Sequence, residues 1–354
     1  MPSQKITDLL KKGVVIPASP LALDEKKRID TASQKVIYRY YIDAGARGIA
    51  VGVHSTQFEI RDPEFRLFEP LLKLALEEMK SIEERTNQPV IKIAGVCGKT
   101  SQAAREAEFA ASVGYDMALL SLASFREESE DEIIAHCKEI AGIIPIMGFY
   151  LQTSIGGRML PYSFWRKFVE IENVLAIKVA AFNRYQTIDV VRALLDSGME
   201  DRVSLYTGND DNIILDLLTP YGMKVNGAWK MIHFRGGLLG QWSVWTKRAV
   251  EILEQIKELR SSGKDISPEW LTRNAQYTEA NAAVFDAAHE FRGCISGINE
   301  VLRQQGLIRY SHCLREDEKL SGGQLEEIRR VRESYSWLID DDFVRENLSK
   351  WRNC

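Results

Sequence analysis

The sequence has few cysteines, and none of them is spaced as metal ligands or redox partners usually are. The 354 residues include five cysteines, an odd number, scattered along the chain at Cys97, Cys137, Cys294, Cys313 and Cys354. This spacing argues against a disulfide framework and against a zinc motif. It favours a reducing compartment, so we expect a cytoplasmic protein.

A long apolar segment and an excess of positive charge are also missing. The most apolar stretch, residues 141–151, is too short to cross a bilayer and contains Pro145. Residues 1–13 are polar and lack the apolar core of a signal peptide. The net charge is only −4, with 27% charged residues. These features predict a soluble protein that acts on a small molecule, without a nucleic-acid or membrane partner.

What the chain does contain is a regular alternation of short apolar runs with helical patterns. Most of the runs are apolar at consecutive positions, which is typical of parallel strands buried on both faces. The strands are predicted at residues 14–17, 48–52, 90–95, 117–121, 144–150, 174–179, 203–206 and 224–228. Eight strand–helix alternations without a dinucleotide-binding glycine motif predict an α/β fold, a (β/α)8 TIM barrel.

After about residue 267 the strand signal ends and only helical patterns remain. Helices are predicted at residues 269–288, 295–305 and 323–337. No low-complexity linker separates them from the preceding residues. We therefore expect a barrel formed by residues 1–266 and a C-terminal helical extension, residues 267–354, packed on its side.

Two lysines lie within apolar predicted strands and are candidates for covalent chemistry. Lys178 comes late in its strand, where a barrel places its active site, and burial there would lower its pKa and leave a nucleophilic amine. Lys92 comes earlier in an equally apolar strand, so we expect it deeper or nearer the wrong face. A lysine that reaches solvent or pairs with a carboxylate is the alternative for either one.

Polar groups follow two other predicted strands. Tyr150 ends the fifth strand, where its phenol could relay protons or its ring could simply close a packing layer. His54, Ser55 and Thr56 follow the second strand after Gly52. Their side chains and backbone amides could hold a substrate carboxylate, or they could form an ordinary turn before the next helix.

Several segments together resemble one enzyme family. They are Val15-Ile16-Pro17-Ala18-Ser19-Pro20-Leu21, residues 44–49 with 52–58, Gly95-Val96-Cys97-Gly98-Lys99-Thr100, and Gly208-Asn209-Asp210. Tyr150 and Lys178 fall one strand apart, as a catalytic tyrosine and a Schiff-base lysine do in that family. From about residue 12 to 340 the chain resembles the dihydrodipicolinate synthase/N-acetylneuraminate lyase family of Schiff-base aldolases.

The resemblance implies a lyase that needs no separate cofactor, because Lys178 itself forms an imine with a 2-oxo acid such as pyruvate. Tyr150 would relay protons during aldol cleavage, condensation or dehydration. The implied substrate-binding residues are His54, Ser55, Thr56, Arg158, Asn209 and Gly227. A homodimer or homotetramer is expected, as is common in the family, and no metal site is expected.

Three departures argue against the synthase reaction of lysine biosynthesis. The carboxylate-binding turn has His54-Ser55-Thr56 where the family has two threonines and a glycine. Phe125 occupies the place of the synthase's second tyrosine and cannot relay a proton. The segment after Tyr150 is longer than usual, and Arg158 in it would replace the arginine that grips a second carboxylate.

Two alternatives stay open. One is a barrel enzyme that binds a phosphorylated substrate through Arg235-Gly236-Gly237 and uses a carboxylate such as Asp210 instead of an imine. The other is a non-catalytic small-molecule sensor that keeps the fold and the lysine.

Overall fold

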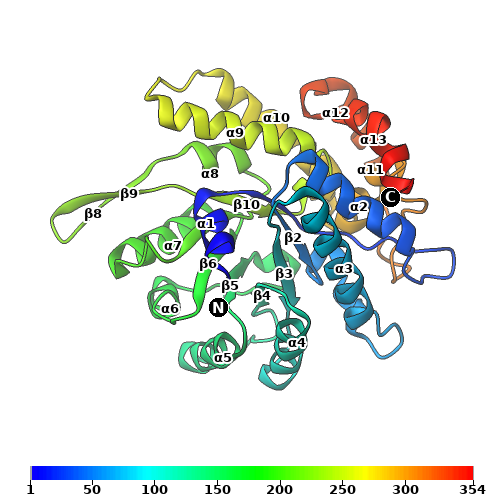
Figure 1. Ribbon diagram of the computed structural model, residues 1–354. Helices are drawn as coiled ribbons and strands as arrows, with labels where there is room; N and C mark the ends of the chain where they lie inside the picture. The colour runs from blue at the N-terminus through cyan, green and yellow to red at the C-terminus, as the bar shows by residue number, and fades with distance from the viewer. Residues whose placement is uncertain (1, 354) are drawn as a thin grey trace. The chain divides into compact units, whose positions relative to one another are not determined.

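The computed structural model describes residues 2–353 (Figure 1). Eight strands form one sheet in the order β1-β10-β7-β6-β5-β4-β3-β2, with helices between them along the chain. This is the parallel strand order of a (β/α)8 barrel. The predicted fold class, a TIM barrel followed by C-terminal helices, is confirmed.

The chain divides into two compact units. The first contains Met1–Gly13 and Ile93–Gly237, and the second contains Val14–Lys92 and Leu238–Cys354. Strands β3 and β10 pass from one unit to the other. This division does not coincide with a boundary between residues 266 and 267, because the C-terminal helices belong to the second unit together with the first two barrel strands.

The first unit carries the middle of the sheet, and Figure 1 shows its helices along the strands. Its strands are β3 (Ile91–Val96, from Ile93 on), β4 (Met117–Ser121), β5 (Ile146–Leu151), β6 (Val174–Ala180), β7 (Ser204–Thr207) and the start of β10 (Gly236–Leu239). Its helices are α1 (Gln4–Lys12), α4 (Thr100–Val113), α5 (Glu130–Ile143), α6 (Tyr162–Phe168), α7 (Arg184–Ser197) and α8 (Ile213–Leu218).

Local sequence signals explain where these helices begin and end. Ser129 and Glu132 form a capping box at the start of α5, and the acidic residues of its first turn favour the helix N-terminus. Gly114 and Gly198 end α4 and α7 in the left-handed conformation, as the sequence predicts. The strands are buried along nearly their whole length, which accounts for their continuous apolar character.

The second unit combines β1 (Val15–Pro17) and β2 (Gly48–Val51) with the remaining long helices. These are α2 (Thr31–Ala44), α3 (Phe68–Thr86), α9 (Thr246–Ser262), α10 (Glu269–Phe285), α11 (Cys294–Gln304), α12 (Gln324–Ser334) and α13 (Asp341–Asn353). Helix α13 packs on α2, where the rings of Tyr40, Phe343 and Trp351 lie within 6.3 Å of one another. The last helix is therefore part of this unit's core.

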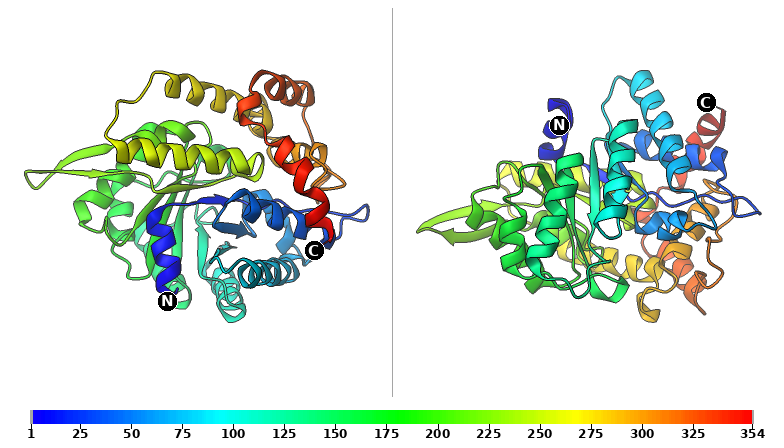
Figure 2. Two further views of the ribbon diagram at one scale, coloured as in Figure 1. Left: turned by 45° about the horizontal axis from the view of Figure 1, so that its top comes forward. Right: turned by 90° about the horizontal axis from the view of Figure 1, so that it is seen from below.

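The predicted eighth strand is wrong. Residues 221–232 form an antiparallel hairpin, β8 (Tyr221–Val225) and β9 (Ala228–Ile232), which extends away from the strands of its unit in the views of Figure 2. Asn226 and Gly227, both with positive φ, form its turn. An Asn-Gly pair between two short strands is the standard signal for such a hairpin, and the prediction overlooked it.

The eighth barrel strand is instead β10, which pairs with β7 through Gly236 and Tyr206. The N–H of Arg235 donates to the carbonyl of Leu205, so Arg235-Gly236-Gly237 begins a strand and does not follow one. The sequence places this motif after the strand predicted at residues 224–228, and that placement is wrong. The motif therefore does not lie at the carboxyl end of a barrel strand, where a phosphate site would be expected.

Two further observations concern the described residues 2–353. None of the helices in this part of the chain combines the length and the apolar character that crossing a bilayer requires. Cys97, Cys137, Cys294 and Cys313 are free thiols, and the fifth cysteine, Cys354, lies outside the described residues.

Candidate active site

Lys178 lies buried in β6, in the first unit. Its Nζ lies 4.3 Å from the centre of the Phe149 ring on the neighbouring strand β5. Burial lowers the pKa of this lysine to about 8, while the negative charge of Asp210 acts in the opposite direction. With a pKa of about 8, roughly a tenth of the side chain is the uncharged amine near pH 7, and this is the form that attacks a carbonyl.

Gly208 makes room for this lysine. Strand β7 ends at Thr207, and Gly208 follows with its N–H donating to the carbonyl of Val179, 2.7 Å away. A Cβ atom on Gly208 would lie 2.6 Å from Cε of Lys178 and 2.8 Å from Cβ of Ala180. Such distances are too short for carbon atoms, so the position of Lys178 requires a glycine here.

The turn after β7 is fixed by the side chain of Asn209. Its Oδ1 accepts from the N–H of Phe182 at 2.9 Å, and its Nδ2 donates to Asp216 at 2.8 Å and to Thr187 at 3.3 Å. Asn209 is fully buried. Asn209 is predicted to bind substrate, and in the structure its amide holds this turn.

Asp216, on α8, is the centre of this hydrogen-bond network. Its carboxylate accepts from the hydroxyl of Thr207 at 2.7 Å, from Asn212 at 3.1 Å and from the hydroxyl of Tyr221 at 3.2 Å, in addition to Asn209. Arg184 forms an ion pair with the same carboxylate. The network joins β7, α7, α8 and the hairpin. It was not predicted from the sequence.

Asp210 and Asp211 follow in the same turn but have different surroundings. Asp210 is 6% exposed, and its charge acts on Lys178. Asp211 is influenced by Arg184 and Asp216, and burial raises the pKa of its carboxyl group. Of the two neighbouring carboxylates, Asp210 is the one whose charge reaches the lysine.

The structure does not bring Tyr150 to Lys178. In the β5–β6 register Phe149 pairs with Lys178 and Tyr150 with Val179, and successive side chains of a strand point to opposite faces. The Tyr150 hydroxyl accepts from the N–H of Leu160 at 3.2 Å, and its ring centre lies 5.1 Å from that of Trp165 on α6.

The charges around Tyr150 agree with this orientation. Burial raises the pKa of its phenol, and Asp189 on α7 adds to the increase. Tyr150 thus faces the helices that cover the sheet, and Phe149 occupies the position beside the lysine.

Arg158 connects two loops of the first unit. Its Nη1 donates to the carbonyls of Phe125 at 2.9 Å and of Glu128 at 3.1 Å. Phe125 is itself buried, with its ring 4.4 Å from that of His136. In this arrangement the guanidinium of Arg158 holds the backbone after β4.

His54, Ser55 and Thr56 form a short 3-10 helix in the second unit. The hydroxyl of Ser55 donates to the carbonyl of Ala18 at 2.7 Å, and that of Thr56 donates to the carbonyl of Ser19 at 2.6 Å. The ring of His54 lies edge-on to that of Phe58. The segment is therefore a rigid turn tied to the loop after β1.

The remaining candidates have other roles. Gly227, predicted to bind substrate, lies at the exposed tip of the β8–β9 hairpin. Lys92 donates to Glu83 on α3 at 2.7 Å and to the carbonyl of Val90 at 3.0 Å. It faces the helix layer, as its early position in the strand predicts.

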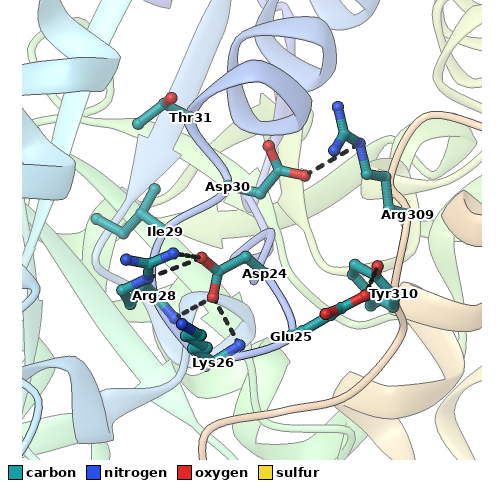
Figure 3. Close-up of a pocket in the computed structure, with 9 residues that line it drawn as sticks. All are labelled: Asp24, Glu25, Lys26, Arg28, Ile29, Asp30, Thr31, Arg309 and Tyr310. Carbon is teal, nitrogen blue, oxygen red and sulfur yellow. Dashed lines mark hydrogen bonds and ion pairs between the residues drawn. The ribbon is translucent and has the colours of Figure 1, made fainter.

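A depression in the second unit, shown in Figure 3, is lined mainly by charged residues that pair with one another. Arg28 binds Asp24 at 2.7 Å, Arg309 lies 3.7 Å from Asp30, and the Tyr310 hydroxyl donates to Glu25 at 2.5 Å. These pairs tie the loop before α2 to residues 309 and 310. Among residues 2–353, no group of three or more His, Cys, Asp or Glu side chains is arranged to hold a metal ion.

Comparisons with known proteins place this geometry in context. Residues 11–228, more than half of the chain, match the model of the dihydrodipicolinate synthetase family. The 4-hydroxy-tetrahydrodipicolinate synthase of Clostridium perfringens is 30% identical over 148 residues, which are 40% of this chain and 49% of that protein. The chain thus spans about half the length of the curated relatives it matches.

Solved structures are similar over almost their whole length. N-acetylneuraminate lyase from Fusobacterium nucleatum has a TM-score of 0.70 at 17% identity, covering 92% of this chain and 99% of that one. Dihydrodipicolinate synthase from Acinetobacter baumannii, complexed with pyruvate, has a TM-score of 0.72 at 17% identity, with the same coverage. At this level of identity the similarity establishes the fold.

Proposed function

This chain belongs to the dihydrodipicolinate synthetase family, and from that premise we propose that it is a class I lyase acting on a 2-oxo acid such as pyruvate. The amine of Lys178 forms an imine with C2 of the oxo acid. The imine withdraws electrons, so that a bond to C3 can be made or broken. Aldol cleavage, aldol condensation and a related dehydration all use this intermediate.

The observation that carries the proposal is the environment of Lys178. It is a buried lysine in an apolar strand whose pKa is lowered to about 8 by burial. Gly208 leaves space against its side chain. A buried lysine kept for stability alone would be expected to pair closely with a carboxylate, as Lys92 does with Glu83.

We propose a carboxylate-binding role for the turn formed by His54, Ser55 and Thr56 in the second unit. Its resemblance to the family's carboxylate-binding turn supports this role. The hydroxyls of Ser55 and Thr56 and the N–H of Thr56 already donate to backbone carbonyls, so the family resemblance alone supports this role. We further propose that the protein is cytoplasmic and forms a homodimer or homotetramer. Light scattering of the purified protein would test the oligomeric state.

The test is reduction of the imine by borohydride in the presence of pyruvate, followed by intact mass measurement and peptide mapping. We expect one reduced pyruvyl group on Lys178. The Lys178→Met variant should gain none, whereas Lys92→Met, a matched control in another apolar strand, should be labelled like the unaltered protein. An absence of adduct on folded protein, with pyruvate and with other 2-oxo acids, would refute the proposal.

One observation favours a second candidate, a sensor that binds a 2-oxo acid as an imine without turning it over. The phenol of Tyr150, the expected proton relay, faces away from Lys178. Such a protein would form the borohydride-trapped adduct but would not exchange the C3 protons of pyruvate with solvent. Exchange of these protons with deuterium, followed by NMR in D2O, separates the two candidates.

A further inference from the structure

Imine chemistry on Lys178 requires a group that moves protons. The ammonium must lose a proton before it attacks, the hydroxyl of the first adduct must gain one to leave as water, and C3 must give one up to form the enamine. General acid–base catalysis of this kind needs a side chain within reach of the reacting atoms. In this chain the phenol of Tyr150 is directed to α6 and α7 instead.

Two aromatic side chains near the lysine do not supply this group. Phe149 lies under Nζ and has no proton to transfer. Tyr206 pairs with Lys178 in the sheet, but its hydroxyl donates to the carbonyl of Leu10 on α1 at 2.8 Å. The turn after β7 also lies against the lysine, at Gly208.

We propose that Asp210, two residues beyond Gly208, is the acid–base group of the Lys178 site. Its side chain is buried, its N–H donates to the carbonyl of Gly208 at 3.1 Å, and its charge acts on the lysine. The inference rests on the proposed function, because it concerns the protons of the same imine. It replaces the tyrosine relay that the family resemblance implies with a carboxylate from another strand.

The steps balance with this one carboxylate. Asp210 takes a proton from the Lys178 ammonium, and the free amine bonds to C2 of pyruvate while an N–H proton moves to the carbonyl oxygen. The protonated Asp210 then gives its proton to the hydroxyl, the C–O bond breaks, and water leaves. The carboxylate so regenerated takes a proton from C3, which converts the iminium into the enamine.

The structure also explains how Asp210 is held in place. The turn that carries it is fixed on both sides, by the bond from the N–H of Gly208 to Val179 and by the bonds of Asn209 to Phe182, Thr187 and Asp216. A rigid turn keeps the carboxylate in a constant position relative to β6. Preorganisation of this kind is what an acid–base group needs.

Asp211 provides a matched control. It has the same side chain, lies next to Asp210 and is partly buried, but its charged neighbours are Arg184 and Asp216. A general effect of removing charge from this turn would be the same for both residues. An effect specific to the lysine site should appear only at Asp210.

The experiment compares Asp210→Asn, Asp211→Asn, Tyr150→Phe and the unaltered protein, with pyruvate as the probe. Two quantities are measured: the final extent of borohydride-trapped adduct, and the rate of C3 deuterium exchange in D2O. For Asp210→Asn we expect an adduct close to the unaltered level and exchange slower by about 100-fold or more. Asp211→Asn and Tyr150→Phe should exchange within about threefold of the unaltered protein, a difference too small for loss of an acid–base group.

A fourth variant guards against a folding defect. Asp210→Glu keeps the carboxyl group, so it should recover part of the exchange that Asp210→Asn loses. Exchange at the unaltered rate in Asp210→Asn, or its loss in Tyr150→Phe alone, would overturn the assignment of Asp210. No adduct on the unaltered protein would instead refute the proposed function, and the assignment with it.

Discussion

At the scale of single residues, the lysine was predictable and the groups around it were not. A lysine late in an apolar strand is unusual, so Lys178 can be found from the sequence. Which of the adjacent aromatic residues Phe149 and Tyr150 lies beside it depends on strand register. The register shifts between Ile146 and Met147 in the β5–β6 pair, and no local pattern in the sequence reveals such an irregularity.

The pH dependence of imine formation follows from the pKa of Lys178. The uncharged amine is the nucleophile, so the rate of adduct formation with pyruvate should rise with pH and level off above a midpoint of about 8. Asp210 is the charged group that acts on this lysine, and a nearby negative charge favours the ammonium. Asp210→Asn should therefore shift the midpoint to lower pH. Rapid-quench trapping across the midpoint measures it.

The contrary result is equally informative. If the midpoint of Asp210→Asn stays unchanged or moves to higher pH, the charge of Asp210 does not act on Lys178 as described. Asp211→Asn serves as the control, because burial and Asp210 set the pKa of Lys178. The midpoint of this variant should match that of the unaltered protein.

At the scale of secondary-structure elements, the periodicity of the sequence predicts most of the barrel. Seven strands lie where they are expected, because each is a continuous apolar run between helices. The eighth failed because β10, Gly236-Gly237-Leu238-Leu239, is short and half glycine, while residues 224–228 offered a competing run. Glycines give no side chains to reveal a buried strand.

The hydrogen-bond network around Asp216 joins several elements, so we expect a substitution of Asp216 to lower stability. Asp216→Ala removes the acceptor for Thr207, Asn209 and Tyr221 and leaves Arg184 without its ion-pair partner. We expect the free energy of unfolding to fall by about 2–4 kcal/mol, because buried donors lose their acceptor. Denaturant titration measures this change.

The same variant should also affect the lysine site. Loosening the turn that carries Gly208 and Asp210 should slow C3 deuterium exchange even under conditions where the variant remains folded. Asp201→Ala, which removes an exposed carboxylate from the same unit, should change neither quantity. Unaltered stability of Asp216→Ala would show that the network contributes little.

At the scale of the whole molecule, the sequence predicts the existence of the C-terminal helices better than their relation to the rest. The loss of strand signals after residue 267 predicts a helical extension packed on the side of the barrel, but it does not predict which residues this extension contacts. In the structure Arg39 on α2 forms a bidentate ion pair with Glu78 and donates to the carbonyl of Trp351 at 2.6 Å. The hydroxyl of Tyr40 donates to Asp340 at 2.7 Å. Such long-range contacts leave no trace in local periodicity.

We expect these contacts to stabilise the second unit. Substitutions of two tryptophans test this expectation. Trp351 on α13 is 1% exposed and packs against Tyr40 and Phe343, whereas Trp229 on the hairpin is 77% exposed. Trp351→Ala should lower the free energy of unfolding by about 3–5 kcal/mol, the cost of a large cavity in a core. Trp229→Ala should change it by less than about 0.5 kcal/mol. If denaturant titration shows that Trp351→Ala also changes it by less than about 0.5 kcal/mol, the C-terminal helix contributes little to the stability of the second unit.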